Sequence, residues 1–147
     1  MAALHYFAFG SNLHGARLRE RAPSTRALGA ARLEGFRLCL DKLASDGSGK
    51  VNLAQDPTTS VWGVVFQIER ADLATLDRFE PGYSQISVSV QLRGGGLLEA
   101  QTYLCEQRTP GLRAQPWYHA LILSGAREHD LPAEWIGILE RLPAARG

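Results

Sequence analysis

Residues 61–68, VWGVVFQI, are the stretch of sequence around which the rest of the chain is organised. All of these residues except Gln67 are apolar or glycine, and four of them are β-branched, namely three valines and one isoleucine. A short apolar run of this kind is typical of a strand that is buried on both faces. We therefore expect residues 61–68 to form a central strand of a sheet.

Three further stretches are predicted to pair in the same sheet. Residues 4–9 are apolar and aromatic, which predicts a second buried strand. Residues 86–92 alternate between apolar and polar side chains, so this strand should have one face in water. Three glycines at 94–96 then predict a turn into a partner strand over residues 97–105.

Shorter strands are predicted at residues 30–33, 36–40 and 51–54. Turn signals flank the last of these, namely Asp46-Gly47-Ser48-Gly49 on one side and Asp56-Pro57 on the other. The expected total is six or seven strands.

Helices are predicted where the spacing of apolar residues changes from that of a strand to that of a helix. Residues 13–21 and 72–80 have helical spacing, and prolines open two more helices over residues 116–129 and 132–141. Three or four helices with mostly hairpin-linked strands indicate an α+β fold, in which a curled or closed antiparallel sheet carries helices at its rim. At 147 residues the chain has room for a single domain, residues 1–147.

Composition excludes several classes of function. Sixteen basic and fifteen acidic residues give a net charge of +1, so no overall field attracts nucleic acid or an anionic membrane. The densest basic cluster is Arg17, Arg19 and Arg21, which we interpret as a solvated helix face. No apolar run is long enough for a membrane span, and the N-terminus lacks a signal-peptide pattern, so we expect a cytoplasmic protein. Cys39 and Cys105 lack metal-ligand spacing and are expected to be reduced core thiols, with no metal site.

A carboxylate within the predicted helix 72–80 is the first candidate for chemistry. Leu73, Leu76 and Glu80 fall on one face of that helix, so Glu80 would lie in its apolar stripe. Pro81 should end the helix near its negative dipole end. Burial and dipole would both raise the pKa of Glu80 toward neutral pH, which suits proton transfer. Asp77 is a second candidate, and a frayed helix end with Glu80 in solvent is the alternative.

The second candidate is the abrupt end of the first strand in residues 6–13, YFAFGSNL. Glycine allows the backbone to approach a ligand closely, and successive N–H groups at such a turn can bind a carboxylate or an oxyanion. A tight turn with only a structural role fits the same residues.

Four segments in order along the chain resemble the γ-glutamylcyclotransferase family. They are Phe-Ala-Phe-Gly-Ser-Asn-Leu at 7–13, Val-Trp-Gly-Val-Val at 61–65, Leu-Asp-Arg-Phe-Glu at 76–80, and Gly-Ala-Arg-Glu-His-Asp-Leu-Pro at 125–132. The resemblance implies a small, mostly antiparallel β-barrel with peripheral helices. It also implies an enzyme that cyclises a γ-glutamyl group to 5-oxoproline and releases a free amine or amino acid.

The resemblance also implies roles for particular residues. Glu80 matches the family's catalytic glutamate, which would act as general acid and base. A small-molecule γ-glutamyl substrate would lie against the residues that match the opening motif and two later aromatic positions: Phe9, Gly10, Ser11, Asn12, Leu13, Tyr83 and Tyr118. Tyr103 corresponds to a further aromatic position. The reaction requires no metal or organic cofactor, because the nucleophile is the amine of the substrate.

Two differences from the family pattern concern substrate preference. Phe9 stands where tyrosine is usual, and Ser84-Gln85 follows Tyr83 where many relatives carry arginines. The glutathione-specific branch has a different opening motif, Gly-Tyr-Gly-Ser-Leu, which disfavours glutathione. Several γ-glutamyl compounds remain open as substrates, and the protein could be a monomer or a homodimer.

Two other functions are weighed beside cyclisation. A serine amidohydrolase would use Ser11 as nucleophile with His5, His14, His119 or His129 as base, but the second glycine of a nucleophile elbow is missing. A non-catalytic module that binds γ-glutamyl or other small molecules on the same fold is the remaining alternative.

Overall fold

A computed structural model describes residues 3–145, so the two outermost residues at each end of the predicted domain lie outside the described part. The elements are β1 (Ala3–Ala8), the 3₁₀-helix η1 (Ser11–Leu13), α1 (Gly15–Arg21), β2 (Arg26–Leu43), β3 (Gly49–Glu69), α2 (Arg70–Asp77), β4 (Ser84–Leu92), β5 (Leu97–Leu104), α3 (Pro116–Glu128) and α4 (Ala133–Glu140).

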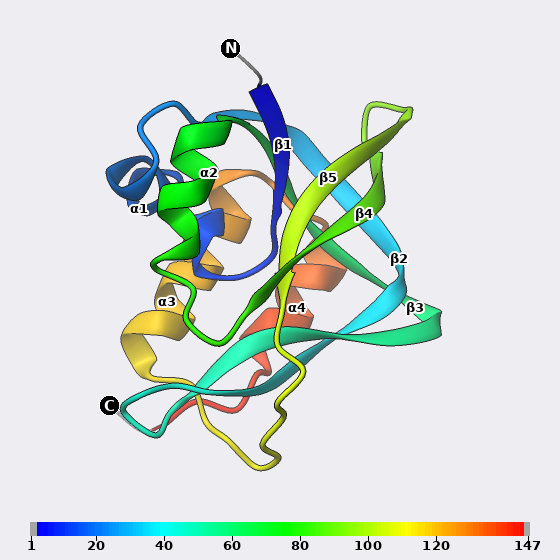
Figure 1. Cartoon of the computed structure of the whole chain (residues 1–147). Coiled ribbons are helices and arrows are strands. Elements are labelled where there is room, and N and C mark those ends of the chain that lie inside the picture. The colour runs from blue at the N-terminus through cyan, green and yellow to red at the C-terminus, as the bar shows by residue number, and fades with distance from the viewer. Residues whose placement is uncertain (1–2, 146–147) are drawn as a thin grey trace.

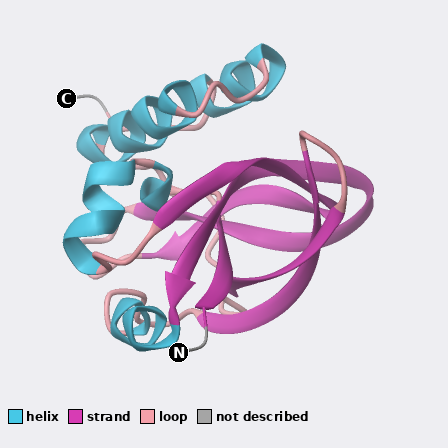
Figure 2. Cartoon of the chain, turned by 90° about the horizontal axis from the view of Figure 1, so that it is seen from above, coloured by secondary structure: helices cyan, strands magenta, loops and turns pink. Residues whose placement is uncertain are grey.

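The five strands close into a barrel in the order β1-β3-β2-β4-β5. Neighbouring strands are antiparallel, except that β1 and β5 close the barrel as a parallel pair at Tyr6 and Gln101. The helices lie outside the barrel and gather to one side of it (Figures 1 and 2). The predicted α+β fold with a small, mostly antiparallel barrel is therefore confirmed.

The predicted number of strands is wrong, because β2 and β3 are each one long strand. Residues 30–33 and 36–40 both belong to β2, and residues 51–54 and 61–68 both belong to β3. The described residues thus form five strands rather than six or seven.

A large irregularity in the pairing of β2 with β3 explains this difference. Glu34 pairs with Ser60 and Phe36 with Gln55, so residues 56–59 bulge out opposite the single residue Gly35. Gly35 has a φ of 85°, which glycine adopts without strain. Asp56-Pro57 therefore interrupts the ladder without reversing the chain, as bulges do.

The predicted strands 86–92 and 97–105 and the two C-terminal helices are confirmed within one or two residues. Helix α2 ends at Asp77, three residues earlier than expected. The N–H groups of Phe79 and Glu80 donate to carbonyls three residues back, so the chain tightens into 3₁₀ turns before Pro81. Glu80 accordingly lies beyond the helix, in the loop that leads to Tyr83.

The central strand contains a glycine because an aromatic ring lies across it. A Cβ on Gly63 would lie 2.3 Å from the carbonyl oxygen of Ala8 and 2.7 Å from the ring of Phe7. Phe7 is fully buried, and its ring fills the space that a side chain at position 63 would need. This close approach fixes β1 against β3, directly before the chain turns into η1.

Helix α3 holds the turn after β1 from behind. A Cβ on Gly125 would lie 2.4 Å from the carbonyl carbon of Leu13 and 2.5 Å from the amide nitrogen of His14. One turn later, the Glu128 carboxylate accepts a hydrogen bond of 3.4 Å from the N–H of Gly15. The segment 125–128 thus positions the backbone that connects η1 to α1.

Both cysteines are free, as expected. Cys105 is buried, but Cys39 is only half-buried on β2, beside Arg37, so its predicted core location is wrong. Among residues 3–145, no helix is both long and apolar enough to cross a membrane.

Two helical glycines provide a matched test of this packing. We expect Gly125→Ala to lower the free energy of unfolding by about 1–3 kcal/mol, because the new methyl group meets backbone atoms that cannot move independently. Gly137→Ala in α4 should be neutral or stabilise by up to about 1 kcal/mol, since its Cβ meets only the flexible end of Arg141. Urea denaturation of both variants measures the difference, and equal effects would contradict the proposed role of Gly125.

Candidate active site

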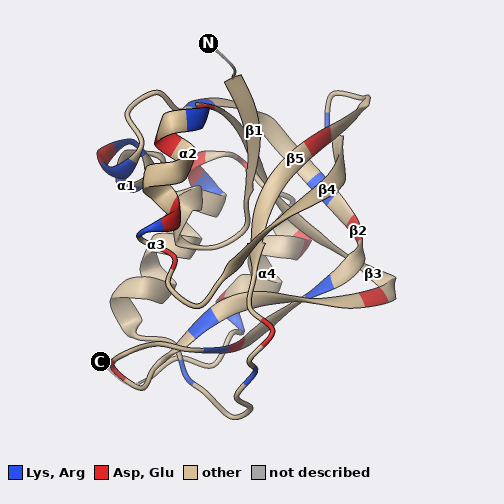
Figure 3. Ribbon diagram, viewed as in Figure 1, with Lys and Arg blue, Asp and Glu red and all other residues tan. Residues whose placement is uncertain are grey.

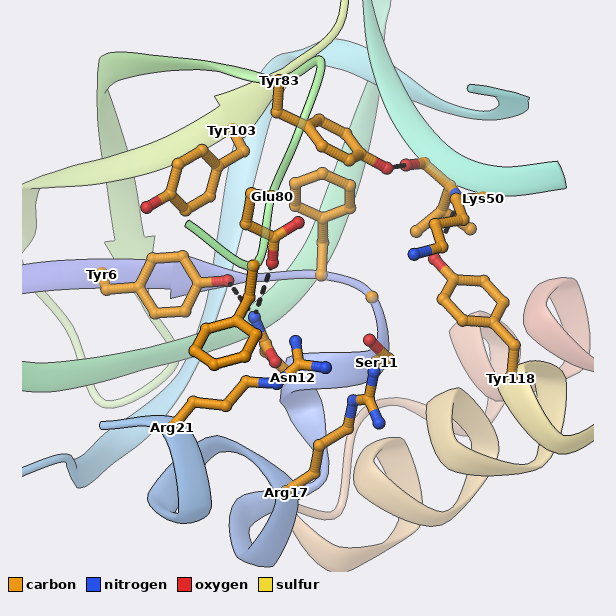
Figure 4. A pocket seen from close by; sticks show the side chains of 14 residues that line it. Tyr6, Ser11, Asn12, Arg17, Arg21, Lys50, Glu80, Tyr83, Tyr103 and Tyr118 are labelled. Atoms are coloured by element: carbon orange, nitrogen blue, oxygen red, sulfur yellow. Dashed lines mark hydrogen bonds between the residues drawn. The ribbon is translucent and has the colours of Figure 1, made fainter. Parts of the chain in front are cut away.

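A pocket opens where the end of β1, the start of α1 and the loop after α2 meet (Figure 4). Its walls come from six parts of the chain and are mostly aromatic or charged. The lining residues are Tyr6, Phe9, Gly10, Ser11, Asn12, Arg17, Arg21, Lys50, Val51, Phe79, Glu80, Tyr83, Tyr103 and Tyr118.

Glu80 is the one carboxylate in this pocket. Its Oε1 accepts a hydrogen bond of 3.1 Å from Nδ2 of Asn12. Burial raises the pKa of Glu80 above its ordinary value. The positive charges of Arg21 and Lys50 and the hydrogen bond from Asn12 act in the opposite direction, but the net shift is upward. The direction of the shift agrees with the expectation from the sequence, and burial, one of its two expected causes, is the largest contribution.

Asn12 connects the loop after β1 to this carboxylate. Its side chain is 4% exposed, and its Nδ2 also donates to the hydroxyl of Tyr6 at 3.0 Å. The Oδ1 atom of Asn12 is buried without a hydrogen-bond partner among the described residues. A ligand that brings a hydrogen-bond donor would pair with this acceptor.

The loop that lines this pocket also has backbone donors at the start of its 3₁₀ turn. The N–H groups of Leu13 and His14 are bonded to the carbonyls of Gly10 and Ser11. The first N–H groups of the 3₁₀ turn, at Ser11 and Asn12, have no acceptor within the turn itself. Leu13, which the resemblance placed against the substrate, is not among the residues that line the pocket. Its side chain is fully buried, and its N–H group already donates to the carbonyl of Gly10.

Position 10 has no space for a side chain, because the opposite wall of the pocket lies too close. A Cβ at this position would lie 2.7 Å from Cγ2 of Val51 and 3.5 Å from the hydroxyl of Tyr118. Phe9 is 6% exposed and lines the pocket with its ring, 6.4 Å from that of Phe7. Because position 9 is phenylalanine rather than the tyrosine of the family pattern, this part of the pocket wall is apolar.

Two tyrosines hold the backbone of Val51 at the start of β3. The hydroxyl of Tyr83 donates to the Val51 carbonyl at 2.7 Å, and the hydroxyl of Tyr118 accepts from the Val51 N–H at 3.0 Å. Burial raises the pKa of both hydroxyls, so both remain protonated at neutral pH. The proton of Tyr118 is therefore free to be donated into the pocket.

The sequence prediction for the basic cluster is wrong for two of its three arginines. Arg17 and Arg21, four residues apart on α1, line the pocket, whereas Arg19 is exposed. Arg21 lies 4.6 Å from the ring centre of Phe79, and Arg17 lies 5.8 Å from that of Trp117. The signal in the sequence that could have indicated this placement is the i, i+4 spacing of the two arginines directly after the loop, because residues so spaced share one helix face.

The other candidates lie outside the pocket. Asp77 is exposed and accepts hydrogen bonds from the hydroxyl of Tyr103 and from Gln85, so it positions a wall residue rather than facing the cavity. None of the pocket-lining residues is a histidine. His14 instead caps α1 through its Nδ1, and the ring of His119 contacts the carbonyl of Leu139. Ser11 therefore has no histidine beside it in the pocket to act as its base.

The open volume inside the pocket is about 40 Å³, which is room for one or two water molecules. Outward movement of wall side chains would widen this space. The guanidinium groups of Arg17 and Arg21 and the 45% exposed ring of Phe79 lie at the mouth and can move without disturbing the core. A wider cleft of about 360 Å³ adjoins the pocket at Glu80.

Comparisons with known proteins agree on one family. The sequence model of the AIG2-like family matches residues 60–139, which is more than half of the chain. A mouse γ-glutamylcyclotransferase is 32% identical over 142 residues, and its human counterpart 33%; each alignment covers 88% of this chain and 73% of the relative. A solved structure titled γ-glutamyl cyclotransferase superposes with a TM-score of 0.91 at 29% identity, covering 99% of this chain and 91% of the other.

The burial of Glu80 predicts a pH-dependent cost in stability. Because its pKa is raised above the ordinary value of 4.5, the folded protein binds more protons than the unfolded chain in the window above that value. The contribution of Glu80 to stability therefore falls as pH rises through the window. Glu80→Gln keeps the acceptor for Asn12 but removes this loss, so its stability relative to the unmodified protein should increase with pH.

Urea denaturation between pH 4 and 8 measures this trend. The Glu106→Gln variant, which removes an exposed carboxylate that does not line the pocket, serves as control. A stability difference for Glu80→Gln that stays flat or shrinks with pH would show that the carboxylate is not destabilised by burial.

Proposed function

The chain belongs to the AIG2-like family and is an enzyme of the γ-glutamylcyclotransferase type, and we propose that it converts a γ-glutamyl compound to 5-oxoproline with Glu80 as proton carrier. The observation that carries this proposal is a desolvated carboxylate held by Asn12 in a pocket that is otherwise cationic and aromatic.

The reaction joins the α-amine of the substrate to its own γ-carbonyl carbon. The new C–N bond closes a five-membered ring, and the old amide C–N bond breaks. The attacking ammonium loses two protons and the departing nitrogen gains two, so no net proton is taken up or released. A single carboxylate that can reach both nitrogens can carry these protons, and a raised pKa suits it to do so near neutral pH.

Positive charge in the pocket would hold the glutamyl end. Arg17 and Arg21 lie on the side of α1 that lines the pocket. There, a guanidinium group would bind the α-carboxylate of the substrate. The N–H groups of Ser11 and Asn12 and the hydroxyl of Tyr118 are donors available to the oxyanion that forms at the γ-carbonyl.

The walls would supply the conformational part of catalysis. Cyclisation requires a folded substrate, and holding the amine against the carbonyl can contribute about 7 kcal/mol or more. Tyr6, Phe9 and Tyr103 form a rigid aromatic wall, with Tyr6 and Tyr103 packed edge-on at 5.9 Å. Such a wall favours the compact conformer over an extended one.

The two carboxylates of the segment 76–80 provide a matched test. We expect Glu80→Gln to lower kcat about a hundredfold or more while binding of the γ-glutamyl compound is retained, because the amide cannot accept the ammonium proton. Asp77→Asn should cause a much smaller loss, since Asp77 does not line the pocket.

The measurement is release of 5-oxoproline, followed by mass spectrometry over a panel of γ-glutamyl amino acids and amines. Near-normal turnover by Glu80→Gln would remove Glu80 from the mechanism. Binding without 5-oxoproline release from any panel member would favour the non-catalytic binding module instead.

A further inference from the structure

The loop that carries Glu80 runs from the end of α2 to β4 and is attached to the barrel at both of its ends. Figure 3 shows acidic and basic residues close together where α2 ends and this loop begins; they are Asp77, Arg78 and Glu80. At the far end of the loop, the hydroxyl of Tyr83 donates to the carbonyl of Val51 in β3 at 2.7 Å. The side chain of Asp77 makes the attachment at the near end.

The Asp77 carboxylate contacts both strands of the β4–β5 hairpin. Its Oδ1 accepts hydrogen bonds from the hydroxyl of Tyr103 in β5 and, at 3.1 Å, from Nε2 of Gln85 in β4. Gln85 and Tyr103 lie directly opposite each other in the ladder of these two strands. The end of α2 is therefore bound to a single cross-strand pair of the barrel.

Tyr103 makes this contact with its hydroxyl while its ring lines the pocket. In Figure 4 the hydroxyl points away from the Glu80 carboxylate, and the ring packs edge-on against the rings of Tyr6 and Tyr83. The residue is 4% exposed, and burial raises the pKa of its hydroxyl, which therefore stays protonated and can donate. A buried hydroxyl needs an acceptor, and the Asp77 carboxylate provides one.

The backbone of Asp77 connects this attachment to Glu80. The carbonyl of Asp77 accepts a hydrogen bond of 3.2 Å from the N–H of Glu80. One residue thus binds the barrel with its side chain and the Glu80 backbone with its carbonyl. On the other side, the N–H of Tyr83 donates to the carbonyl of Glu80 at 3.1 Å. Because such short turns have few bonds of their own, the place of Glu80 depends on the attachments at the two ends.

We propose that Asp77 is a positioning residue for the reaction: by binding the end of α2 to Tyr103 and Gln85, it keeps the Glu80 carboxylate within reach of both substrate nitrogens. The inference rests on the proposed function. It assigns a role to an exposed carboxylate that does not line the pocket, one turn before the carboxylate that does. Asp77 then acts on the reaction only through the place of Glu80.

Two substitutions of Asp77 separate hydrogen bonding from charge. Asp77→Asn keeps the single oxygen that accepts both bonds, so kcat should stay near normal. Asp77→Leu keeps the branched shape but accepts no hydrogen bond. Its kcat should fall about tenfold, because a misplacement of about 1 Å or less is enough to slow a reaction. KM should change little in either variant, since Asp77 does not line the pocket.

A double-mutant cycle tests whether the Tyr103 hydroxyl acts through Asp77. Tyr103→Phe removes the hydroxyl and keeps the ring in the pocket wall. It should lower kcat in the unmodified protein but cause no further loss in Asp77→Leu, because the bond is already absent there. The matched control is Glu69→Leu, which removes an exposed carboxylate at the opposite end of α2 and should leave kcat unchanged.

Hydrogen exchange measures the attachment without the reaction. The amides of Arg78, Phe79 and Glu80 donate to carbonyls within the turns at the end of α2. In Asp77→Leu they should exchange about tenfold faster than in Asp77→Asn, because opening the loop no longer breaks the bonds to the barrel. Amides of α4, whose local opening leaves these bonds intact, should exchange equally in both variants.

Normal kcat in Asp77→Leu, or an equal loss of kcat in Asp77→Asn, would overturn the proposal. A rise in KM at unchanged kcat would also overturn it, because it would assign Asp77 to binding. Failure of the proposed function has a different signature. If even the unmodified protein releases no 5-oxoproline, faster exchange confined to residues 78–80 in Asp77→Leu shows that the attachment exists and the reaction does not. Equal exchange in the two variants rejects the attachment itself.

Discussion

The partial burial of the Glu80 carboxylate, which raises its pKa, is the constraint on which the rest of the site depends. A carboxylate is stable there only because Asn12 donates to it and cations face it. Asn12 can do so because its loop is fixed from behind by the bare backbone of Gly125 in α3. The barrel, the helix outside it and the turn after β1 thus act together to hold one acidic group at a raised pKa.

The same arrangement explains why the site has two compartments. The narrow side, with Asn12 and Tyr118, offers directed donors and little free volume, which suits the part of a substrate that must fold on itself. The open side is the wider cleft of about 360 Å³, and Lys50 lines both sides. Glu80 lines both sides, so the proposed proton transfer would take place where they meet.

Local patterns in the sequence were sufficient for the elements whose pairing is local. The hairpin 86–105 and the strand 61–68 follow from alternation, apolar content and turn residues alone. The bulge at residues 56–59 could not be predicted, because it depends on which residues of β2 lie opposite. Likewise, the resemblance indicated Glu80, but the place of Arg17 at the pocket depends on how α1 packs, which helical spacing alone leaves undetermined.

The central claim is that the substrate's own amine, and not water or an enzyme nucleophile followed by water, attacks the γ-carbonyl. Turnover of γ-glutamylalanine in water enriched in ¹⁸O tests it directly, with product masses read by mass spectrometry. Intramolecular attack predicts 5-oxoproline that carries no ¹⁸O, together with free alanine. Glutamate that carries one ¹⁸O atom in its γ-carboxylate would instead show hydrolysis and contradict the account.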